Sequence, residues 1–131
     1  ASQFDFELKV ACPDGFEPNA DLLKTHSNRV ALFRDPAEAA READLVVTDV
    51  WASMGQESEE SERINSFEGY QVNAEIMAEA KSSALFMHCL PAHRGEEVSA
   101  EVLDAKDSVV WDEAENRMHS QKALLEYLLK F

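Results

Sequence analysis

Several residue types are scarce in this sequence of 131 residues, and each scarcity excludes a class of protein. Cys12 and Cys89 are the only cysteines. Two thiols cannot form the disulfide framework of a small secreted domain, and they favour a reducing cytoplasm. The four glycines stand far apart, at positions 15, 55, 69 and 95. The sequence therefore contains neither the G-x-G-x-x-G dinucleotide fingerprint nor a P-loop.

Long apolar runs are also absent from the sequence. No stretch reaches the length of about 18 apolar residues that a transmembrane helix requires. Residues 1–8 contain acids and lack the basic-then-apolar order of a signal peptide, so we expect neither a membrane anchor nor a secretion signal.

Basic residues are the third scarcity, with 12 lysines and arginines against 26 acids and a net charge of −14. This balance repels phosphate backbones and anionic lipids, so nucleic acid and membrane are poor partners. Simple solubility explains the charge well. The glutamates at positions 57, 59, 60 and 62 predict a solvated loop rather than a metal site, and we expect neither a metal nor a cofactor.

The chain alternates apolar segments with helical patterns, and its length fits one domain. In the third apolar segment, residues 43–50, we expect Val46, Val47 and Val50 to be buried. Polar, glycine-containing residues 51–66 predict a loop with at most one helical turn. Strands are predicted at 8–12, 29–33, 43–50, 83–88 and 107–111. Helices are predicted at 18–25, 36–42, 71–81 and 112–129.

This alternation is typical of parallel β-α-β units with right-handed crossovers. We therefore expect an α/β fold in which a three-layer parallel sheet carries helices on both faces, as in Rossmann-like domains. Residues 49–55, 88–95 and 112–122 would follow strands in such a fold. Because the carboxyl ends of parallel strands share one edge, we expect these three segments to meet in a single crevice.

Residues 86–95 contain the densest group of reactive side chains, in the order Phe-Met-His-Cys-Leu-Pro-Ala-His-Arg-Gly. Cys89 is the one candidate nucleophile with activating groups nearby in sequence. A buried, inert thiol is the ordinary explanation of the same residue, and position alone slightly favours it. His88, His93 and Cys89 could instead bind zinc, although no C-x-x-C pair accompanies them.

Three further residues or segments have both a functional and an ordinary explanation. Asp49 either caps the following loop or binds an amino group. Arg117 either forms a surface ion pair or clamps an anion in the crevice. Residues 53–55, Ser-Met-Gly, fit a lid with a glycine pivot and also fit a plain surface loop.

Four motifs together resemble the aspartate/ornithine carbamoyltransferase family, and specifically its ornithine-binding domain. They are Asp-Val-Trp-Ala-Ser-Met-Gly-Gln-Glu at 49–57, Phe-Glu-Gly-Tyr-Gln-Val-Asn at 67–73, His-Cys-Leu-Pro-Ala-His-Arg-Gly at 88–95, and Asp-Glu-Ala-Glu-Asn-Arg at 112–117. The Ser-Met-Gly loop and the His-Cys-Leu-Pro run favour ornithine over aspartate or putrescine as the amine acceptor.

The resemblance implies a role for each matching residue. Asp49, Ser53 and Met54 would bind ornithine and orient its side-chain amine. Cys89 and Leu90 would lie at the reacting centre beside the carbamoyl group, and Arg117 would contact carbamoyl phosphate. Asp49 and Cys89 would be the catalytic pair. The family's Leu-Pro bond is cis, so a cis peptide is expected between Leu90 and Pro91.

The resemblance also implies what this chain lacks. It covers only the ornithine-binding domain, at residues 1–131, without that domain's first strand and its Asn-rich loop. The family's carbamoyl-phosphate domain has no counterpart, so we expect the isolated chain to be inactive. The parent enzyme would be a cytoplasmic homotrimer that forms citrulline from L-ornithine and carbamoyl phosphate. Two alternatives remain: a non-catalytic amino-acid-binding or interaction module, and a zinc module built on Cys12, His88 and Cys89.

Overall fold

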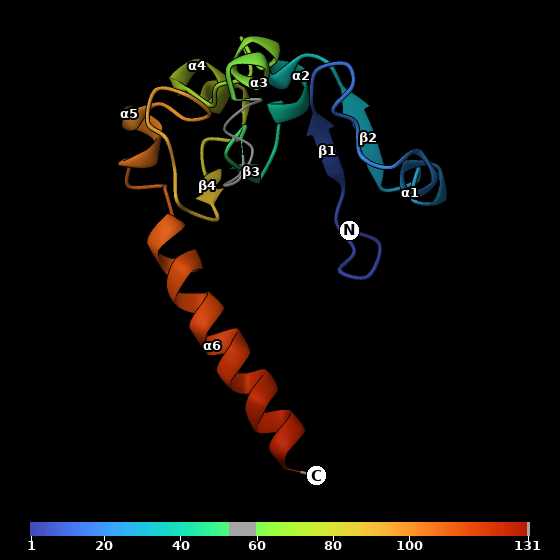
Figure 1. The fold of residues 1–131 in the computed structure, drawn as a ribbon, viewed down its shortest axis with the longest axis vertical. Helices are drawn as coiled ribbons and strands as arrows, with labels where there is room; N and C mark the ends of the chain where they lie inside the picture. Colours follow the sequence, from blue (N-terminus) through green and yellow to red (C-terminus); the bar gives the residue numbers. More distant parts are fainter. Residues whose placement is uncertain (53–59, 131) are drawn as a thin grey trace.

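The strands form two parallel pairs in the computed structural model, which describes residues 1–52 and 60–130 (Figure 1). β1 (Leu8–Ala11) lies beside β2 (Val30–Phe33), and β3 (Leu45–Thr48) lies beside β4 (Leu85–His88). Both pairs are parallel, so the predicted α/β class is confirmed. The strands described do not join into one continuous sheet, and β1 and β3 each keep one edge without a strand partner among these residues.

Short polar side chains start most of the helices. Asn19, Asp35, Asn73 and Ser99 each accept hydrogen bonds from backbone N–H groups in the first turn that follows them. These bonds satisfy donors that the helix itself leaves unpaired. The helices are α1 (Ala20–Thr25), α2 (Pro36–Ala40), α3 (Glu60–Ser66), α4 (Ala74–Glu79), α5 (Ala100–Leu103) and α6 (Val110–Leu129).

The hydrophobic core lies around β4, between that strand and helices α4 and α5. Phe86, Val98 and Val110 have 1% or less of their surface exposed. The full set of buried core residues is Val46, Val72, Ala80, Ala84, Phe86, Val98, Val102, Leu103 and Val110. The core therefore supports the β3–β4 pair more fully than it supports β1 and β2.

The prediction that Val47 is buried is wrong, because its side chain is 59% exposed. Successive side chains of a strand point to opposite faces, and Val46 takes the core face of β3. Leu45 and Leu85 are exposed with Val47. One face of the β3–β4 pair is thus apolar and uncovered within the described part of the chain.

Three further predictions of secondary structure are corrected. Residues 107–111 form only a single parallel bridge, between Ser108 and Phe86, and the last helix begins at Val110 rather than at residue 112. Residues 60–66 are helical although a loop was predicted there. The short helix α5 was missed, since four residues are too few to show helical periodicity.

Helix α6 extends away from the rest of the molecule (Figure 1). Only its first residue, Val110, is buried. Its predicted apolar face exists but is uncovered, because the leucines at 124, 125, 128 and 129 are all exposed. None of the described helices combines the length and the hydropathy needed to cross a bilayer.

Candidate active site

Asp49 and Cys89 follow adjacent strands and lie side by side. The register of the β3–β4 pair places Thr48 opposite His88, so the next residue of each strand leaves the sheet at the same edge. The Cys89 thiol donates a hydrogen bond to Asp49 Oδ1 at 3.1 Å. Two residues 40 positions apart in sequence therefore form one polar pair, as expected for parallel strand ends.

The surroundings of Cys89 favour its protonated form. The hydrogen bond to Asp49 raises the pKa of the Cys89 thiol, and burial and the negative charges of Asp49 and Glu113 raise it further. A reactive cysteine needs the opposite environment, with positive charge that lowers the thiol pKa. The geometry thus suits a thiol that donates hydrogen bonds better than a thiolate nucleophile.

Arg117 brings the third predicted segment to the same place. It lies on α6, and its Nη2 donates a hydrogen bond to the backbone carbonyl of Cys89 at 2.8 Å. The segments that follow β3 and β4 and the first turns of α6 therefore converge, as the topology predicted. Glu113, one turn earlier on α6, was not predicted as a site residue, yet its negative charge raises the pKa of Cys89.

Sequence reasoning missed Glu97, which is fully buried beside a fully buried His88. His88 Nδ1 accepts the Leu90 N–H at 2.9 Å, so the ring hydrogen is on Nε2 and points to Glu97 Oε1, 3.0 Å away. Glu97 Oε1 also accepts the His93 N–H at 2.7 Å. Nothing in the sequence distinguishes Glu97 from its exposed acidic neighbours, because only the fold buries it.

These bonds hold the turn that carries Cys89 and Leu90. Leu90 has a positive φ of 52°, and the Leu90–Pro91 peptide bond is cis, as the resemblance predicted. Leu90 also packs against the hydrophobic core as a partly buried side chain. The turn is therefore tied to the body of the domain by packing and by two buried polar side chains.

Ser53 and Met54, the other predicted ornithine ligands, lie outside the described residues. The residues on either side of this segment are joined by an aromatic cluster. Trp51 stacks on Phe67 with ring centroids 5.8 Å apart, and Arg63 Nη1 donates to the Trp51 carbonyl at 3.4 Å. Phe16 and Tyr70 contact Phe67 edge to face. Trp51 and Arg63, which lie on either side of the segment in the sequence, are thus in contact.

Two groups among the described residues have metal-ligand types within 4.8 Å of one another: Asp49 with His88 and Cys89, and His93 with Glu96 and Glu97. In the first group both ring nitrogens of His88 are already used in hydrogen bonds. Cys12 is in neither group. Its thiol is buried at the end of β1, where burial raises its pKa. The zinc module of Cys12, His88 and Cys89 is therefore not assembled by this fold.

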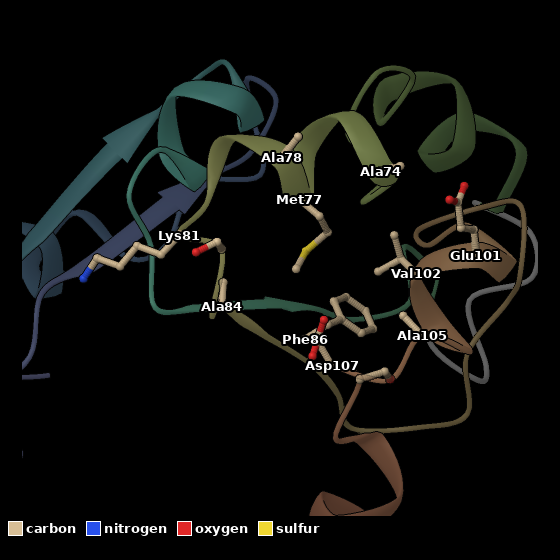
Figure 2. A pocket seen from close by; sticks show the side chains of 12 residues that line it. Ala74, Met77, Ala78, Lys81, Ala84, Phe86, Glu101, Val102, Ala105 and Asp107 are labelled. Carbon is tan, nitrogen blue, oxygen red and sulfur yellow. The ribbon is translucent and has the colours of Figure 1, made fainter.

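Of the predicted site residues that the structure describes, none lines the pocket behind β4 (Figure 2). Met77, Ala84, Phe86 and Val102 form its apolar part, and Lys81, Glu101 and Asp107 stand around it. It lies between α4, α5 and β4, whereas Asp49 and Cys89 follow the carboxyl ends of β3 and β4. The pocket is therefore separate from the candidate active site at Asp49 and Cys89.

Comparison with known proteins assigns this arrangement to a family. The model of the aspartate/ornithine carbamoyltransferase family, Asp/Orn binding domain, matches residues 1–128. The chain belongs to this family. The resemblance seen in the four motifs is thus confirmed over almost the whole sequence.

The ornithine carbamoyltransferase of Methylococcus capsulatus is 64% identical over 129 residues, which are 98% of this chain and 43% of that protein. The anabolic ornithine carbamoyltransferase of Pseudomonas aeruginosa is 58% identical over 130 residues, which are 99% of this chain and 43% of that protein. The chain therefore spans less than half the length of these carbamoyltransferases.

Solved structures of the family share the fold. The ornithine carbamoyltransferase of Pyrococcus furiosus has a TM-score of 0.82 at 49% identity, over 92% of this chain and 41% of its own. The anabolic enzyme of Campylobacter jejuni has a TM-score of 0.86 at 35% identity, over 95% of this chain and 44% of its own. The predicted Rossmann-like α/β fold agrees with both of these structures.

Proposed function

We propose that this chain is the ornithine-binding half of an ornithine carbamoyltransferase, which converts L-ornithine and carbamoyl phosphate into citrulline and phosphate. The observation that carries the proposal is the Asp49–Cys89 pair at the shared edge of β3 and β4. The naming of the relatives at 58% and 64% identity supports ornithine as the amine acceptor.

The reaction requires an uncharged amine next to a carbonyl carbon. The side-chain nitrogen of ornithine attacks the carbonyl carbon of carbamoyl phosphate, a carbon–nitrogen bond forms, and the bond from that carbon to the phosphate oxygen breaks. The amine releases its protons during the reaction. Asp49 is exposed at the strand end, where a carboxylate can orient the amine and accept a proton.

Cys89 would assist without forming a covalent intermediate. The pKa of its thiol is raised, so the thiol stays protonated near neutral pH. It can then donate a hydrogen bond that holds the Asp49 carboxylate in position for the incoming amine. Leu90 follows it in the same turn. Arg117 supplies a guanidinium beside the Cys89 carbonyl, where positive charge can stabilise the oxyanion and the departing phosphate.

The remaining parts of this proposal come from the family. Ser53 and Met54 would contact ornithine, and no cofactor is required. A carbamoyl-phosphate domain would supply the other basic residues around the phosphate, in a cytoplasmic homotrimer that serves arginine biosynthesis. One arginine on an exposed helix face is too little to hold a doubly charged phosphate, so the 131 residues alone should form no citrulline.

A chimaera tests the proposal directly. The segment of the Methylococcus capsulatus relative that precedes the matched region is fused to this chain, and citrulline formation is measured. We expect activity with ornithine and none with aspartate. Asp49→Ala and Cys89→Ser should each lower kcat/KM, with about a 10²-fold loss or more for Asp49→Ala as a proton-handling group.

Cys12→Ser is the matched control, because Cys12 is the other free cysteine and takes no part in the site. It should leave kcat/KM unchanged. A folded, trimeric chimaera without activity would favour a non-catalytic amino-acid-binding module. Activity that survives Asp49→Ala at full strength would remove the role given to the carboxylate.

A further inference from the structure

A second cluster of polar side chains lies in the turn after the cis proline, on residues that the proposed reaction does not use directly. His93, Glu96 and Glu97 bring one nitrogen and two carboxylate oxygens within 4.8 Å of one another. His93 Nδ1 and Glu96 Oε2 are 3.4 Å apart. Backbone bonds from Gly95 N–H to Val98 and from Glu96 N–H to His93 close this turn.

Glu97 provides an independent sign that a ligand is missing. Its side chain is completely buried, and Oε1 already accepts hydrogen bonds from His88 Nε2 and the His93 N–H. Its second oxygen, Oε2, has no hydrogen-bond partner among the described residues. A buried carboxylate oxygen without a donor or cation is costly, so such atoms are almost always paired.

We propose that a divalent first-row transition metal ion, with Zn²⁺ as the representative, binds to His93, Glu96 and Glu97. Imidazole and carboxylate are common ligands of Zn²⁺, at about 2.0–2.1 Å. Two ligands of a tetrahedral ion at that distance lie about 3.3 Å apart, close to the 3.4 Å between His93 and Glu96. A carboxylate oxygen of Glu97, within 4.8 Å of the other two ligand atoms, completes a set of three, and water takes the fourth position.

The surroundings fit this use of the three side chains. His93 and Glu96 are 46% and 38% exposed, so an ion can enter from solvent, while Glu97 closes the site from below. The Glu97 carboxylate is oriented by His88 and by the His93 N–H, as ligating carboxylates usually are. The ion would neutralise the carboxylates of an acidic protein and clamp the turn that follows Leu90 and Pro91.

The neighbouring group of Asp49, His88 and Cys89 is the main competitor for the same ion. It would have to release His88 from the Leu90 N–H or from Glu97, and it would need the Cys89 thiol in its deprotonated form. Both steps oppose binding there. The proposal concerns metal binding by this chain itself, so it stands or falls independently of carbamoyl transfer.

Calorimetric titration of the chelator-treated chain with Zn²⁺ tests the proposal, together with absorption spectra of the Co²⁺ form. We expect one ion per chain and a Co²⁺ spectrum without a thiolate charge-transfer band. His93→Ala and Glu96→Gln should each weaken binding by about tenfold or more. Both positions are partly exposed, and circular dichroism checks that each variant keeps the wild-type fold.

Two controls define the outcome. His119 and Glu115 form another histidine–glutamate contact, at 3.3 Å on α6, and no described residue adds a third ligand there. The double variant His119→Ala, Glu115→Gln should therefore bind like wild type. Cys89→Ser should also bind like wild type. No binding at millimolar Zn²⁺, equal affinity after His93→Ala and Glu96→Gln, or a thiolate band that Cys89→Ser removes would each overturn the proposal.

Discussion

The Nε2 atom of His88 lies 3.0 Å from Oε1 of Glu97, and neither side chain has any exposed surface. The pair sits directly beneath the turn that carries Cys89 and Leu90. His88 accepts one backbone N–H of that turn, and Glu97 accepts another from His93. The position of the candidate catalytic thiol therefore depends on a buried polar pair that never needs to touch a substrate.

Replacing Glu97 by alanine should destabilise the chain strongly. The His88 Nε2–H and the His93 N–H would both lose their acceptor, and each unsatisfied donor costs about 1–3 kcal/mol, so we expect a loss of about 2–6 kcal/mol. Glu97→Gln keeps an oxygen acceptor and should lose less than about 1.5 kcal/mol. Urea denaturation followed by circular dichroism measures both free energies of unfolding.

Glu68→Ala is the matched control, since Glu68 is an exposed glutamate. It should change the free energy of unfolding by no more than about 0.5 kcal/mol. If Glu97→Ala unfolds at the same urea concentration as Glu68→Ala, the two hydrogen bonds of Glu97 do not support the turn.

The thiol of Cys89 should react faster once Asp49 is neutralised. The bond to Asp49 is the largest cause that raises the pKa of Cys89. Asp49→Asn should lower that pKa, so the thiolate fraction at pH 8 rises and alkylation by iodoacetamide speeds up severalfold. The measurement follows the rate between pH 7 and pH 10 by mass spectrometry, in a Cys12→Ser background that leaves one thiol.

The raised pKa of Cys89 also determines how the stability of the fold changes with pH. Because the folded state raises the pKa of Cys89, the protonated thiol stabilises the fold at pH values below the pKa that this thiol has in the unfolded chain. This contribution is lost as the pH rises through the folded pKa.

The alkylation experiment has one outcome that would contradict the prediction. If the pH profile of the iodoacetamide rate does not move toward lower pH in Asp49→Asn, the aspartate does not control the thiol.

Most of helix α6 should open easily in the isolated chain. After Val110 the helix buries none of its residues, and a free helix of this length is only marginally stable in water. Amides in residues 118–129 should therefore exchange hydrogen much faster than those near Val110 and Phe86, whose side chains are in the core. Hydrogen exchange with mass spectrometry measures the contrast within one sample.

The chimaera described under the proposed function provides the control for this prediction. If a second domain packs on α6, the same amides should become protected in the chimaera while those near Val110 change little. Equal protection along the whole helix in the isolated chain would contradict the expectation, and would indicate that copies of the chain associate through α6.

Some structural elements were predictable because their signals are local. Asn19 and Asp35 cap the helices that the sequence predicts to start beside them, and the strands at Leu8 and Leu45 follow from short apolar runs between turn residues. The bridge at Ser108 was mistaken for a strand, because a short run of apolar residues such as 109–111 does not show whether the backbone beside it will find a hydrogen-bonding partner.

The candidate site was likewise predictable only in part. By itself the sequence determined which side chains end up at the strand ends, since Asp49 lies at the end of one predicted strand and Cys89 directly follows another, and their motifs indicated the family. Only the tertiary structure decided that the thiol donates to Asp49, that Arg117 reaches the Cys89 carbonyl, and that Glu97 is buried against His88. Burial and hydrogen-bond partners depend on residues brought together from distant parts of the chain, and no local pattern contains that information.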